Sequence, residues 1–226
     1  MPNAAARKPR LYSYVIPFDD GAAPNPFDGM CTLTICKPKI RSSARPGDWI
    51  AGVGSKNAHS GDLRGHLVYA MRVSEVVTLQ EYDQRAAAEW PHRIPDIGSM
   101  DLSRRLGDCI YDYSGQQVQQ RPGVHGPGNA RRDLGGKNAL IAKTEFYYFG
   151  SRAKKLPRNL RPICPTTQGH RSGKNKDHLA DFEKWIRGLG LAPGQLYGWP
   201  DTVIDWVAPA ACGSCLERAA DNSGEC

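Results

Sequence analysis

The 226-residue sequence has no run of about 18 apolar residues, and this absence excludes a membrane-spanning helix. Residues 1–10 are rich in alanine and basic side chains, and no apolar segment follows them, so a secretory signal is not expected. Internal repeats and low-complexity blocks are also absent. Hydrophobic residues make up 40% of the chain and charged residues 23%, which are ordinary values for a folded domain. We therefore expect a cytoplasmic globular protein with no membrane partner.

Cysteine is scarce and irregularly placed. The 7 cysteines are an odd number scattered through a chain of this size, which is typical of a reducing compartment. Cys212 and Cys215 form a CxxC pair, which supplies only two of the four ligands of a structural zinc site. Cys31 and Cys36, or Cys226 and a histidine, would have to complete such a site, and the spacing matches no established zinc pattern. We expect no metal and no other cofactor, with Cys212 and Cys215 as weak metal candidates.

The common catalytic signatures do not occur in this sequence. It has no GxSxG turn, no Walker phosphate-binding loop, no HExxH motif and no zinc-deaminase motif. The candidates for proton transfer lie in the glycine-rich stretch 114–137, where His125 precedes Arg131 and Asp133. A histidine near a carboxylate and an arginine has the groups for acid–base catalysis and for binding an anion. The same residues equally fit a polar lid, so the sequence leaves open whether the protein is an enzyme.

Acidic residues are missing from the stretch 151–176. The chain carries 30 lysines and arginines against 23 acidic residues, a net charge of +7, and eight of these cations lie in this stretch. Without them the count would be 22 basic against 23 acidic residues, so the excess positive charge sits in one segment. The eight are Arg152, Lys154, Lys155, Arg158, Arg161, Arg171, Lys174 and Lys176.

This cationic segment predicts a nucleic-acid partner. Cations without neighbouring acids neutralise phosphates and release counterions, which gives salt-dependent binding of a nucleic acid, DNA in the first instance. Pro157, Pro162, Pro165 and Gly169 argue against a regular helix, so we expect a flexible arm that becomes ordered on its ligand. The alternative is a mobile loop whose charge merely aids solubility.

Alternating and β-branched segments predict strands, and capping and amphipathic patterns predict helices. The expected helices are 78–89, opened by a capping box of Thr78 and Glu81, a short one at 101–106, and 177–189. This pattern predicts an α+β fold with a mixed, largely antiparallel sheet and two main helices. We assign residues 11–207 to a single domain, with flexible ends at 1–10 and 208–226. The expected strands are 11–18, 31–36, 49–53, 66–77, 109–113 and 138–149.

Aromatic side chains on or beside the expected strands are candidates for stacking on a base. Trp49 follows a turn and precedes a glycine-containing segment where a ligand can approach the backbone, and Tyr111 and Tyr147 lie on other strands. Asn25 and Lys37 are polar residues near the start of the sheet and are candidates for contacts to the same ligand. The alternatives are core packing for each aromatic residue and turn formation for Asn25.

Several segments of the chain have the pattern of a known family. They are 12–15 (YSYV), 23–27 (APNPF), 31–33 (CTL), 36–39 (CKPK), 47–50 (GDWI), 67–73 (LVYAMRV) and 107–111 (GDCIY). Over residues 11–156 the sequence resembles the bacterial and phage nucleotide modification associated domain family, type two. That family is named for its association with systems that install modified DNA bases. The resemblance therefore implies a role beside such a system.

A fainter likeness is to PUA-like domains of the EVE and ASCH kind. These also open with an aromatic strand and have a Gly-Asp turn that leads into the next strand. On this likeness, residues 46–48 begin a strand of a barrel, so a PUA-like barrel is the alternative to an open sheet. The likeness also implies that Ser55 belongs to a base-binding pocket.

These observations leave three functional hypotheses. A binding module would recognise a modified base or nucleotide in DNA, with a pocket near Trp49, Ser55 and Tyr147 and with the stretch 151–176 on the backbone. An enzyme would process a modified base or nucleotide with the histidine, aspartate and arginine of the glycine-rich stretch. A scaffold subunit would join protein partners in a modification complex. The binding module is favoured, because the familiar catalytic signatures are absent and the positive charge is concentrated.

Overall fold

A large mixed sheet forms the centre of the fold. The computed structural model describes residues 7–166 and 169–203, and a sheet of seven strands has the order β11-β1-β3-β4-β9-β12, with β10 added on β4. The β1–β3 and β9–β12 pairs are parallel and the others are antiparallel. The strands are β1 (Leu11–Ile16), β3 (Trp49–Gly54), β4 (His66–Arg72), β9 (Phe146–Tyr148), β10 (Lys154–Lys155), β11 (His170–Arg171) and β12 (Gln195–Leu196).

This sheet is open. Its path ends at β11 on one side and at β12 on the other, and the strands within the described ranges do not close into a barrel. The prediction of an α+β fold with a mixed, largely antiparallel sheet is confirmed. The alternative of a PUA-like barrel is wrong, because β11 and β12 do not pair with each other to close the sheet.

Two smaller sheets complete the β-structure. Three antiparallel strands have the order β2-β8-β5, and β6 pairs with β7 in a two-stranded ribbon. The ribbon lies inside the region where the sequence predicts a strand followed by a long loop. The strands are β2 (Cys31–Leu33), β5 (Glu75–Thr78), β6 (Tyr111–Asp112), β7 (Gln119–Gln120) and β8 (Asn138–Ala142).

The two longest predicted strands are each broken by a bend. The stretch 66–77 divides into β4 and β5, and 138–149 divides into β8 and β9, with one piece in each sheet. At the bends, Ser74 donates from its backbone and its hydroxyl to the Ile141 carbonyl, and its hydroxyl accepts the Lys143 backbone N–H. The prediction of two continuous strands is wrong. Buried apolar residues lie on both sides of each bend, so the apolar alternation continues across the bend and does not reveal it.

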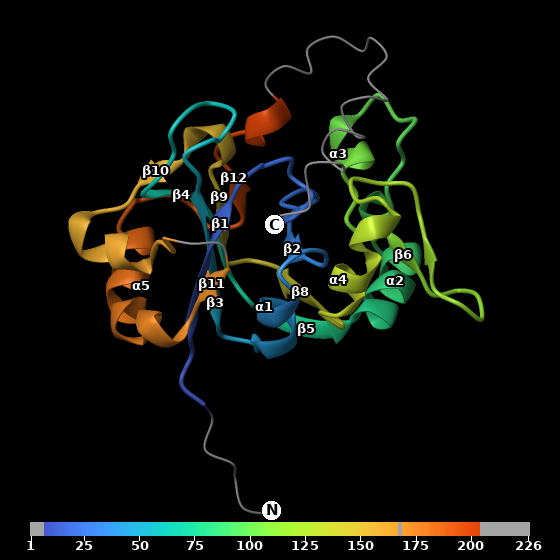
Figure 1. The fold of residues 1–226 in the computed structure, drawn as a ribbon, viewed down its shortest axis with the longest axis horizontal. Coiled ribbons are helices and arrows are strands. Elements are labelled where there is room, and N and C mark those ends of the chain that lie inside the picture. Colours follow the sequence, from blue (N-terminus) through green and yellow to red (C-terminus); the bar gives the residue numbers. More distant parts are fainter. Residues whose placement is uncertain (1–6, 167–168, 204–226) are drawn as a thin grey trace, which may run out of the picture.

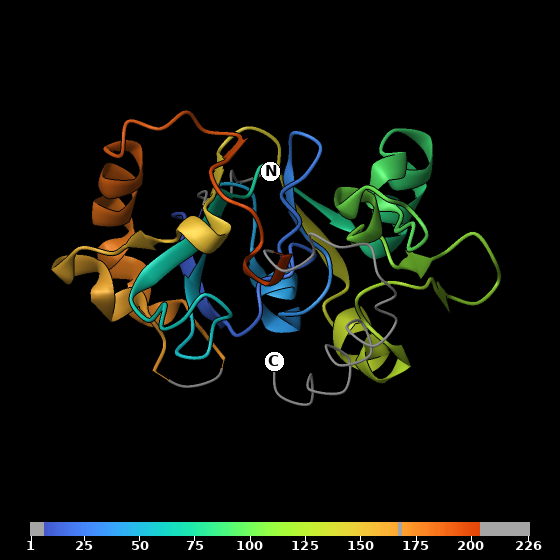
Figure 2. The same ribbon diagram turned by 90° about the horizontal axis from the view of Figure 1, so that it is seen from above.

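Both faces of the large sheet are buried, and different elements cover them. Figures 1 and 2 show α5 (Leu179–Arg187) beside the large sheet, on the side away from the smaller sheets. Phe182 and Ile186 of α5 pack with Trp49 of β3 in one apolar cluster. On the opposite face, α1 (Pro38–Ser43) and the small sheet pack in a second cluster that includes Ile40 and Leu140.

The remaining helices lie mainly around the small sheet. They are α2 (Leu79–Ala88), α3 (Leu102–Arg105) and α4 (Ala130–Leu134). The capping box of Thr78 and Glu81 opens α2 as predicted. Within the described ranges α2 and α5 are the longest helices, which agrees with the prediction of two main helices. Short 3₁₀ helices are η1 (Pro91–Arg93), η2 (Pro127–Asn129), η3 (Gly150–Arg152), η4 (Arg158–Ile163), η5 (Gly173–His178) and η6 (Asp201–Val203).

The cationic segment is folded. Its β10 pairs with β4, its β11 pairs with β1, and the intervening η4 buries Leu160 and Ile163 against the α5 face. The prediction of a flexible arm is wrong for the described part of this segment. Pro157 and Pro162 prevent a long α-helix, and the chain forms 3₁₀ turns between short edge strands instead.

The ends of the chain are only partly described. Arg7 and the backbone of Arg10 bond to Asp48, and Trp49 donates its backbone N–H to the Arg10 carbonyl, so residues 7–10 contact the domain. Residues 1–6 and 204–226 lie outside the described residues, and so do the predicted flexible tail and the candidates Cys212 and Cys215. Among the described helices, none is long and apolar enough to cross a membrane.

A buried arginine holds the first loop to the rest of the domain. Arg93 is fully buried and donates to Asn25 Oδ1 at 2.6 Å, to Thr32 Oγ1 at 3.0 Å and to the carbonyls of Phe27 and Met30. The buried Asp108 lies 4.0 Å from this guanidinium and accepts the Thr32 hydroxyl at 2.5 Å. The side chain of Asn25 is thus part of a structural network. This agrees with the alternative in which Asn25 has a structural role.

We predict that Arg93→Met lowers the free energy of unfolding by about 3–5 kcal/mol, because it leaves the buried Asp108 without its cation and several buried carbonyls without donors. Urea denaturation measures this change. Arg104→Met is the matched control, since Arg104 is partly exposed and lies 3.9 Å from Asp96, a pair whose loss costs less than about 1 kcal/mol. Equal effects of the two substitutions would show that the Arg93 network does not hold the fold.

Candidate functional site

Three side chains from distant parts of the chain meet beside α1. Cys36 follows β2 and directly precedes the residue that caps α1, His125 lies just before η2, and Asp133 lies on α4. Their candidate ligand atoms all lie within 4.8 Å of one another. We call Cys36, His125 and Asp133 the thiol cluster. The sequence identifies His125 and Asp133 as candidates, and the structure brings them together with a cysteine that sequence reasoning did not assign to this site.

Hydrogen bonds connect the three side chains of the thiol cluster. His125 Nδ1 lies 2.5 Å from Asp133 Oδ2, and His125 Nε2 lies 3.5 Å from Cys36 Sγ. Asp133 Oδ1 accepts the Cys36 backbone N–H at 2.8 Å, and Asp133 Oδ2 also accepts the Tyr111 hydroxyl at 3.0 Å. Asp133 is fully buried, whereas the side chain of His125 is 12% exposed and Cys36 is 8% exposed. The Asp133 carboxylate is therefore shielded from solvent, whereas the His125 imidazole is slightly exposed.

His125 and Asp133 in the cluster stabilise each other's charged form. Burial alone lowers the pKa of His125, but hydrogen bonds to Asp133 and Cys36 outweigh it and raise the pKa to about 10. Burial alone raises the pKa of Asp133, but His125, the Cys36 amide and Arg41 lower it below its usual value. Burial and the nearby Asp133 raise the pKa of Tyr111, which keeps its hydroxyl a donor. At neutral pH the cluster thus holds an imidazolium against a carboxylate.

Arg41 of α1 fixes the backbone around the cluster. It is fully buried and donates to the carbonyls of Cys36 (2.7 Å), Asn138 (2.8 Å) and Asp133. A Cβ at Gly136 would lie 2.3 Å from the guanidinium carbon of Arg41, so only glycine leaves room for this side chain. Burial lowers the pKa of Arg41 to about 10, which leaves it charged at neutral pH.

The donor set of the cluster allows two kinds of chemistry. A thiol beside an imidazole that a carboxylate orients is the arrangement of a nucleophile and its base. Cysteine, histidine and aspartate are also ligands that bind zinc, with a fourth position open to solvent. Asp133 already accepts hydrogen bonds at both oxygens from within the protein. This arrangement favours the first kind of chemistry over the second.

The comparisons with known proteins give the family of the chain. The model of nucleotide modification associated domain 2 matches residues 8–207. The chain belongs to the nucleotide modification associated domain 2 family. This membership places it with nucleotide modification systems, as the resemblance at 11–156 implies. No curated protein and no solved structure matches the chain, so the likeness to PUA-like domains gains no support.

Two further predicted residues of this nucleotide modification associated domain lie at the cluster. Tyr111 is buried and bonds to Asp133. Lys37 follows Cys36, and its ammonium lies 4.7 Å from the centre of the Tyr14 ring. Arg131, the third catalytic candidate, is exposed on α4, whereas Asp133 of the same helix is buried.

The other candidates for base binding in this domain are placed apart from the cluster. Trp49 is fully buried, lies edge-on to Phe182 at 5.5 Å, and donates its indole N–H to Glu183 at 2.8 Å. Tyr147 is 3% exposed and belongs to the same apolar cluster under α5. Ser55 lies at the end of β3, where its hydroxyl is 3.4 Å from the Pro17 carbonyl. A base could stack on Trp49 or Tyr147 only after displacing α5.

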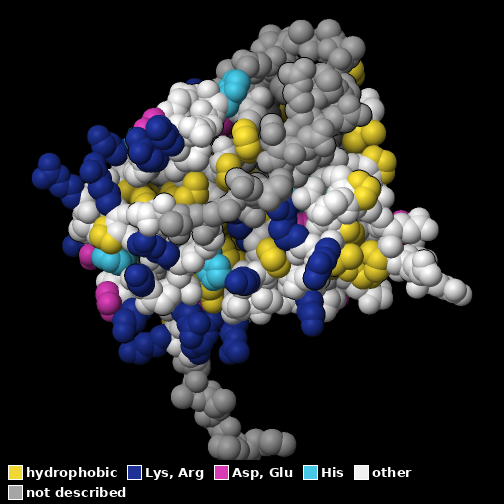
Figure 3. Space-filling view, viewed as in Figure 1, with side chains coloured by type: hydrophobic (Ala, Val, Ile, Leu, Met, Phe, Trp, Pro, Cys, Tyr) yellow, Lys and Arg dark blue, Asp and Glu magenta, His cyan; other side chains and the backbone are white. Residues whose placement is uncertain are grey.

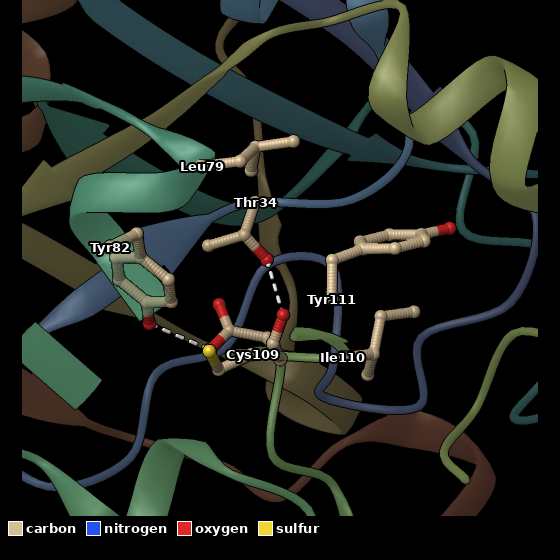
Figure 4. Close-up of a pocket in the computed structure, with 7 residues that line it drawn as sticks. Thr34, Leu79, Tyr82, Cys109, Ile110 and Tyr111 are labelled. Carbon is tan, nitrogen blue, oxygen red and sulfur yellow. Dashed lines mark hydrogen bonds between the residues drawn. The ribbon is translucent and has the colours of Figure 1, made fainter. Parts of the chain in front are cut away.

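Beside Tyr111 the nucleotide modification associated domain has a small internal cavity. Figure 4 shows its lining, which includes Thr34, Tyr82 and Cys109, with the hydroxyl of Tyr111 pointing away from these residues. The cavity has a volume of about 10 Å³, which suits at most one water molecule and no nucleobase. A nucleobase therefore cannot occupy this cavity.

The eight cations of residues 151–176 form a separate surface of the domain. Arg152, Lys155, Arg158, Arg161, Lys174 and Lys176 are exposed, and Lys154 and Arg171 are partly buried. Figure 3 shows Lys and Arg side chains along the left and lower sides of the molecule, the half that holds α5 and β11. In the part of the chain that the structure describes, none of the eight forms an ion pair with an acidic side chain.

We predict a stability loss at high pH that depends on His125. A histidine pKa raised from 6.5 to about 10 contributes stability that is fully present below pH 6.5 and is lost as pH rises through about 10. Between pH 6.5 and 10, the free energy of unfolding of the wild type should fall by over ~1 kcal/mol more than that of His125→Gln. Urea denaturation across this range gives both profiles. Parallel profiles would mean that Asp133 does not hold an imidazolium.

Proposed function

We propose that this domain binds the phosphate backbone of a nucleic acid, DNA first, through its cationic segment, as part of a nucleotide modification system. The observation that carries the proposal is a group of eight cations, mostly exposed, without acidic partners among the described residues. Unpaired surface cations bind polyanions because they release condensed counterions on contact with phosphates. Membership of the nucleotide modification associated domain 2 family agrees with a ligand of this kind.

The framework under these cations is ordered. Arg158 and Arg161 lie on η4 and Lys174 and Lys176 on η5, and both short helices pack against the rest of the domain through buried residues. Asn175 is fully buried and donates to Ser13 Oγ and to the Leu11 carbonyl, which fixes η5 on β1. A surface fixed in this way loses less conformational entropy on binding than a flexible arm would.

Two acids of α5 bond to other groups, whereas Asp177 of η5 is exposed and follows Lys176 directly. Asp181 of α5 lies 3.3 Å from the Asn159 amide nitrogen, and Glu183 accepts the indole N–H of Trp49. The positive surface also extends toward α1, because the Lys37 ammonium lies over the ring of Tyr14, which pairs with His170 of β11. The cations of β11 and η5 thus continue to Lys37, which follows Cys36.

Recognition of a modified base needs a different surface from the one that the sequence suggests. The aromatic faces of Trp49 and Tyr147 are in the core, so a pocket at these residues has no support in the geometry. Binding through phosphates carries no base information by itself. We therefore propose backbone binding as the function of the cationic segment, and assign no base pocket.

The test compares two variants of equal charge. The first replaces Arg158, Arg161, Lys174 and Lys176 by Gln. The second is the control and replaces four cations that lie within 4.0 Å of acids: Arg64, Arg104, Lys143 and Arg187. Fluorescence anisotropy with a labelled DNA duplex, its single strand and the matching RNA measures affinity between 50 and 200 mM salt, a range in which phosphate contacts weaken by orders of magnitude.

We expect the first variant alone to lose affinity and to have a shallower plot of log K against log salt, by up to about 3–4 in slope, since each lost phosphate contact removes about 0.9. The comparison of the three nucleic acids identifies the ligand. Absence of binding by the wild type, or equal slopes for both variants, would contradict the proposal. Equal affinity for modified and unmodified duplexes would agree with backbone binding without base recognition.

A further inference from the structure

We propose that Cys36 is a nucleophile, with His125 as its proton acceptor and Asp133 as the group that orients His125. The proposal adds a covalent acyl-transfer activity to the nucleic-acid binding proposed above and does not depend on it. It begins with the protons on His125. A buried carboxylate only accepts hydrogen bonds, so the 2.5 Å contact with Asp133 Oδ2 puts a proton on Nδ1. The other ring nitrogen, Nε2, then faces Cys36 Sγ at 3.5 Å.

The backbone at Cys36 is held in a strained conformation. Cys36 has φ 54° and Lys37 has φ 41°, both in the left-handed region that non-glycine residues rarely adopt. Lys37 precedes Pro38, which normally favours an extended conformation for the residue before it. Strain of this kind concentrates at functional sites.

Specific contacts keep this strained turn in place. The Cys36 backbone N–H donates to Asp133, and its carbonyl accepts from Arg41. The result is a strand, a tight turn that carries the thiol, and a helix, formed by β2, Cys36 and α1. Serine hydrolases expose their nucleophile on a turn of the same general form. A cysteine that only filled space would need neither the turn nor the imidazole.

The other described cysteines lack these features. Cys31 and Cys109 are buried more deeply than Cys36, and burial raises the pKa of both thiols, which makes them poor nucleophiles. Cys164 is partly exposed, and burial raises the pKa of its thiol as well. In the described ranges only Cys36 has a histidine nitrogen within 4 Å of its sulfur. The chain therefore contains its own reference thiols for a reactivity measurement.

The step can be written with every atom assigned. The step starts from an ion pair in which His125 is the imidazolium and its Nε2 holds the proton of Cys36 Sγ, and the sulfur attacks a carbonyl carbon, forming a C–S bond. The C–N or C–O bond to the leaving group breaks, and the leaving amine or alcohol takes the proton from Nε2. Water or an acceptor amine then loses a proton to Nε2 and attacks the thioester. The C–S bond breaks and the sulfur leaves as the thiolate while Nε2 keeps the proton, which restores the starting ion pair.

The charge beside the thiol suggests the substrate class. Lys37 and Lys39 follow Cys36, and the Lys37 ammonium lies over the ring of Tyr14, which pairs with His170 next to Arg171 of the cationic surface. An acyl or amide group attached to a nucleotide would place its carbonyl at Cys36 and its phosphates on these lysines. This choice of substrate rests on the proposed function, whereas the thiol chemistry does not.

Several charged groups set the pH response of the thiol and the imidazole. They come from every element around the cluster and would all contribute to a measured pH profile. They are Tyr14 on β1, Asp20 on the following loop, Lys37, Arg41 on α1, Tyr111 on β6 and Asp133 on α4. The experiment therefore compares variants at fixed pH and does not interpret one profile alone.

The experiment measures alkylation by iodoacetamide at pH 6, cysteine by cysteine, by mass spectrometry of peptides from the full chain. We expect Cys36 to react at least tenfold faster than Cys164, and His125→Asn to remove this advantage. An asparagine amide retains a donor for Asp133 but has no proton acceptor for the thiol, so this variant should keep the fold. Asp133→Asn should reduce the rate partially. His92→Ala, at an exposed histidine of η1, is the matched control and should leave the rate unchanged.

A second measurement uses p-nitrophenyl acetate as an acyl donor. Release of nitrophenolate with acetyl found on Cys36, and its loss in Cys36→Ser, would support the covalent step. Equal alkylation of Cys36 in the wild type and in His125→Asn, with circular dichroism showing both folded, would overturn the proposal. Stoichiometric zinc in the purified protein, lost in Cys36→Ser, with alkylation only after a chelator, would overturn it in favour of a metal site.

Discussion

The buried carboxylate of Asp133 is the interaction on which the candidate site depends. A buried negative charge needs hydrogen-bond donors and a cation, and the chain supplies them from separate elements. Cys36 contributes its amide from the turn before α1, Tyr111 its hydroxyl from β6, and His125 its imidazole from the loop before η2. Satisfying one charge thus brings three distant segments to one place and fixes the angle at which the thiol is presented.

A second buried network of hydrogen bonds holds segments of the fold together, as Asp133 does at the candidate site. Arg93 gathers the carbonyls of the first loop, and Asp108 accepts the hydroxyls of Thr32 and Tyr82. The family-like segments divide between these two networks. Those at 23–27 and 107–111 contain Asn25 and Asp108, which are structural, whereas the segment at 36–39 contains the thiol. Similarity to a family therefore marks residues that hold the fold as well as residues that do chemistry.

Local patterns explain how much of the structure could be predicted. The capping box of α2, the apolar stripe of α5 and the α+β character depend on residues close in sequence, and sequence reasoning finds them. The role of Cys36 depends on partners 89 and 97 residues away, so no spacing rule reveals it. Trp49 has the sequence context of a ligand site, and only packing of α5, more than a hundred residues later, shows that its ring is covered.

The bends at Ser74 and near Lys143 have a consequence for how the domain unfolds. Because β4 continues into β5 and β9 is the continuation of β8, both sheets share the same two covalent segments. Cleavage of the chain between the two sheets would leave unpaired strand edges on each fragment. Unfolding of one sheet would also destabilise the other. Within residues 7–166 and 169–203, the two sheets are therefore joined covalently at both bends.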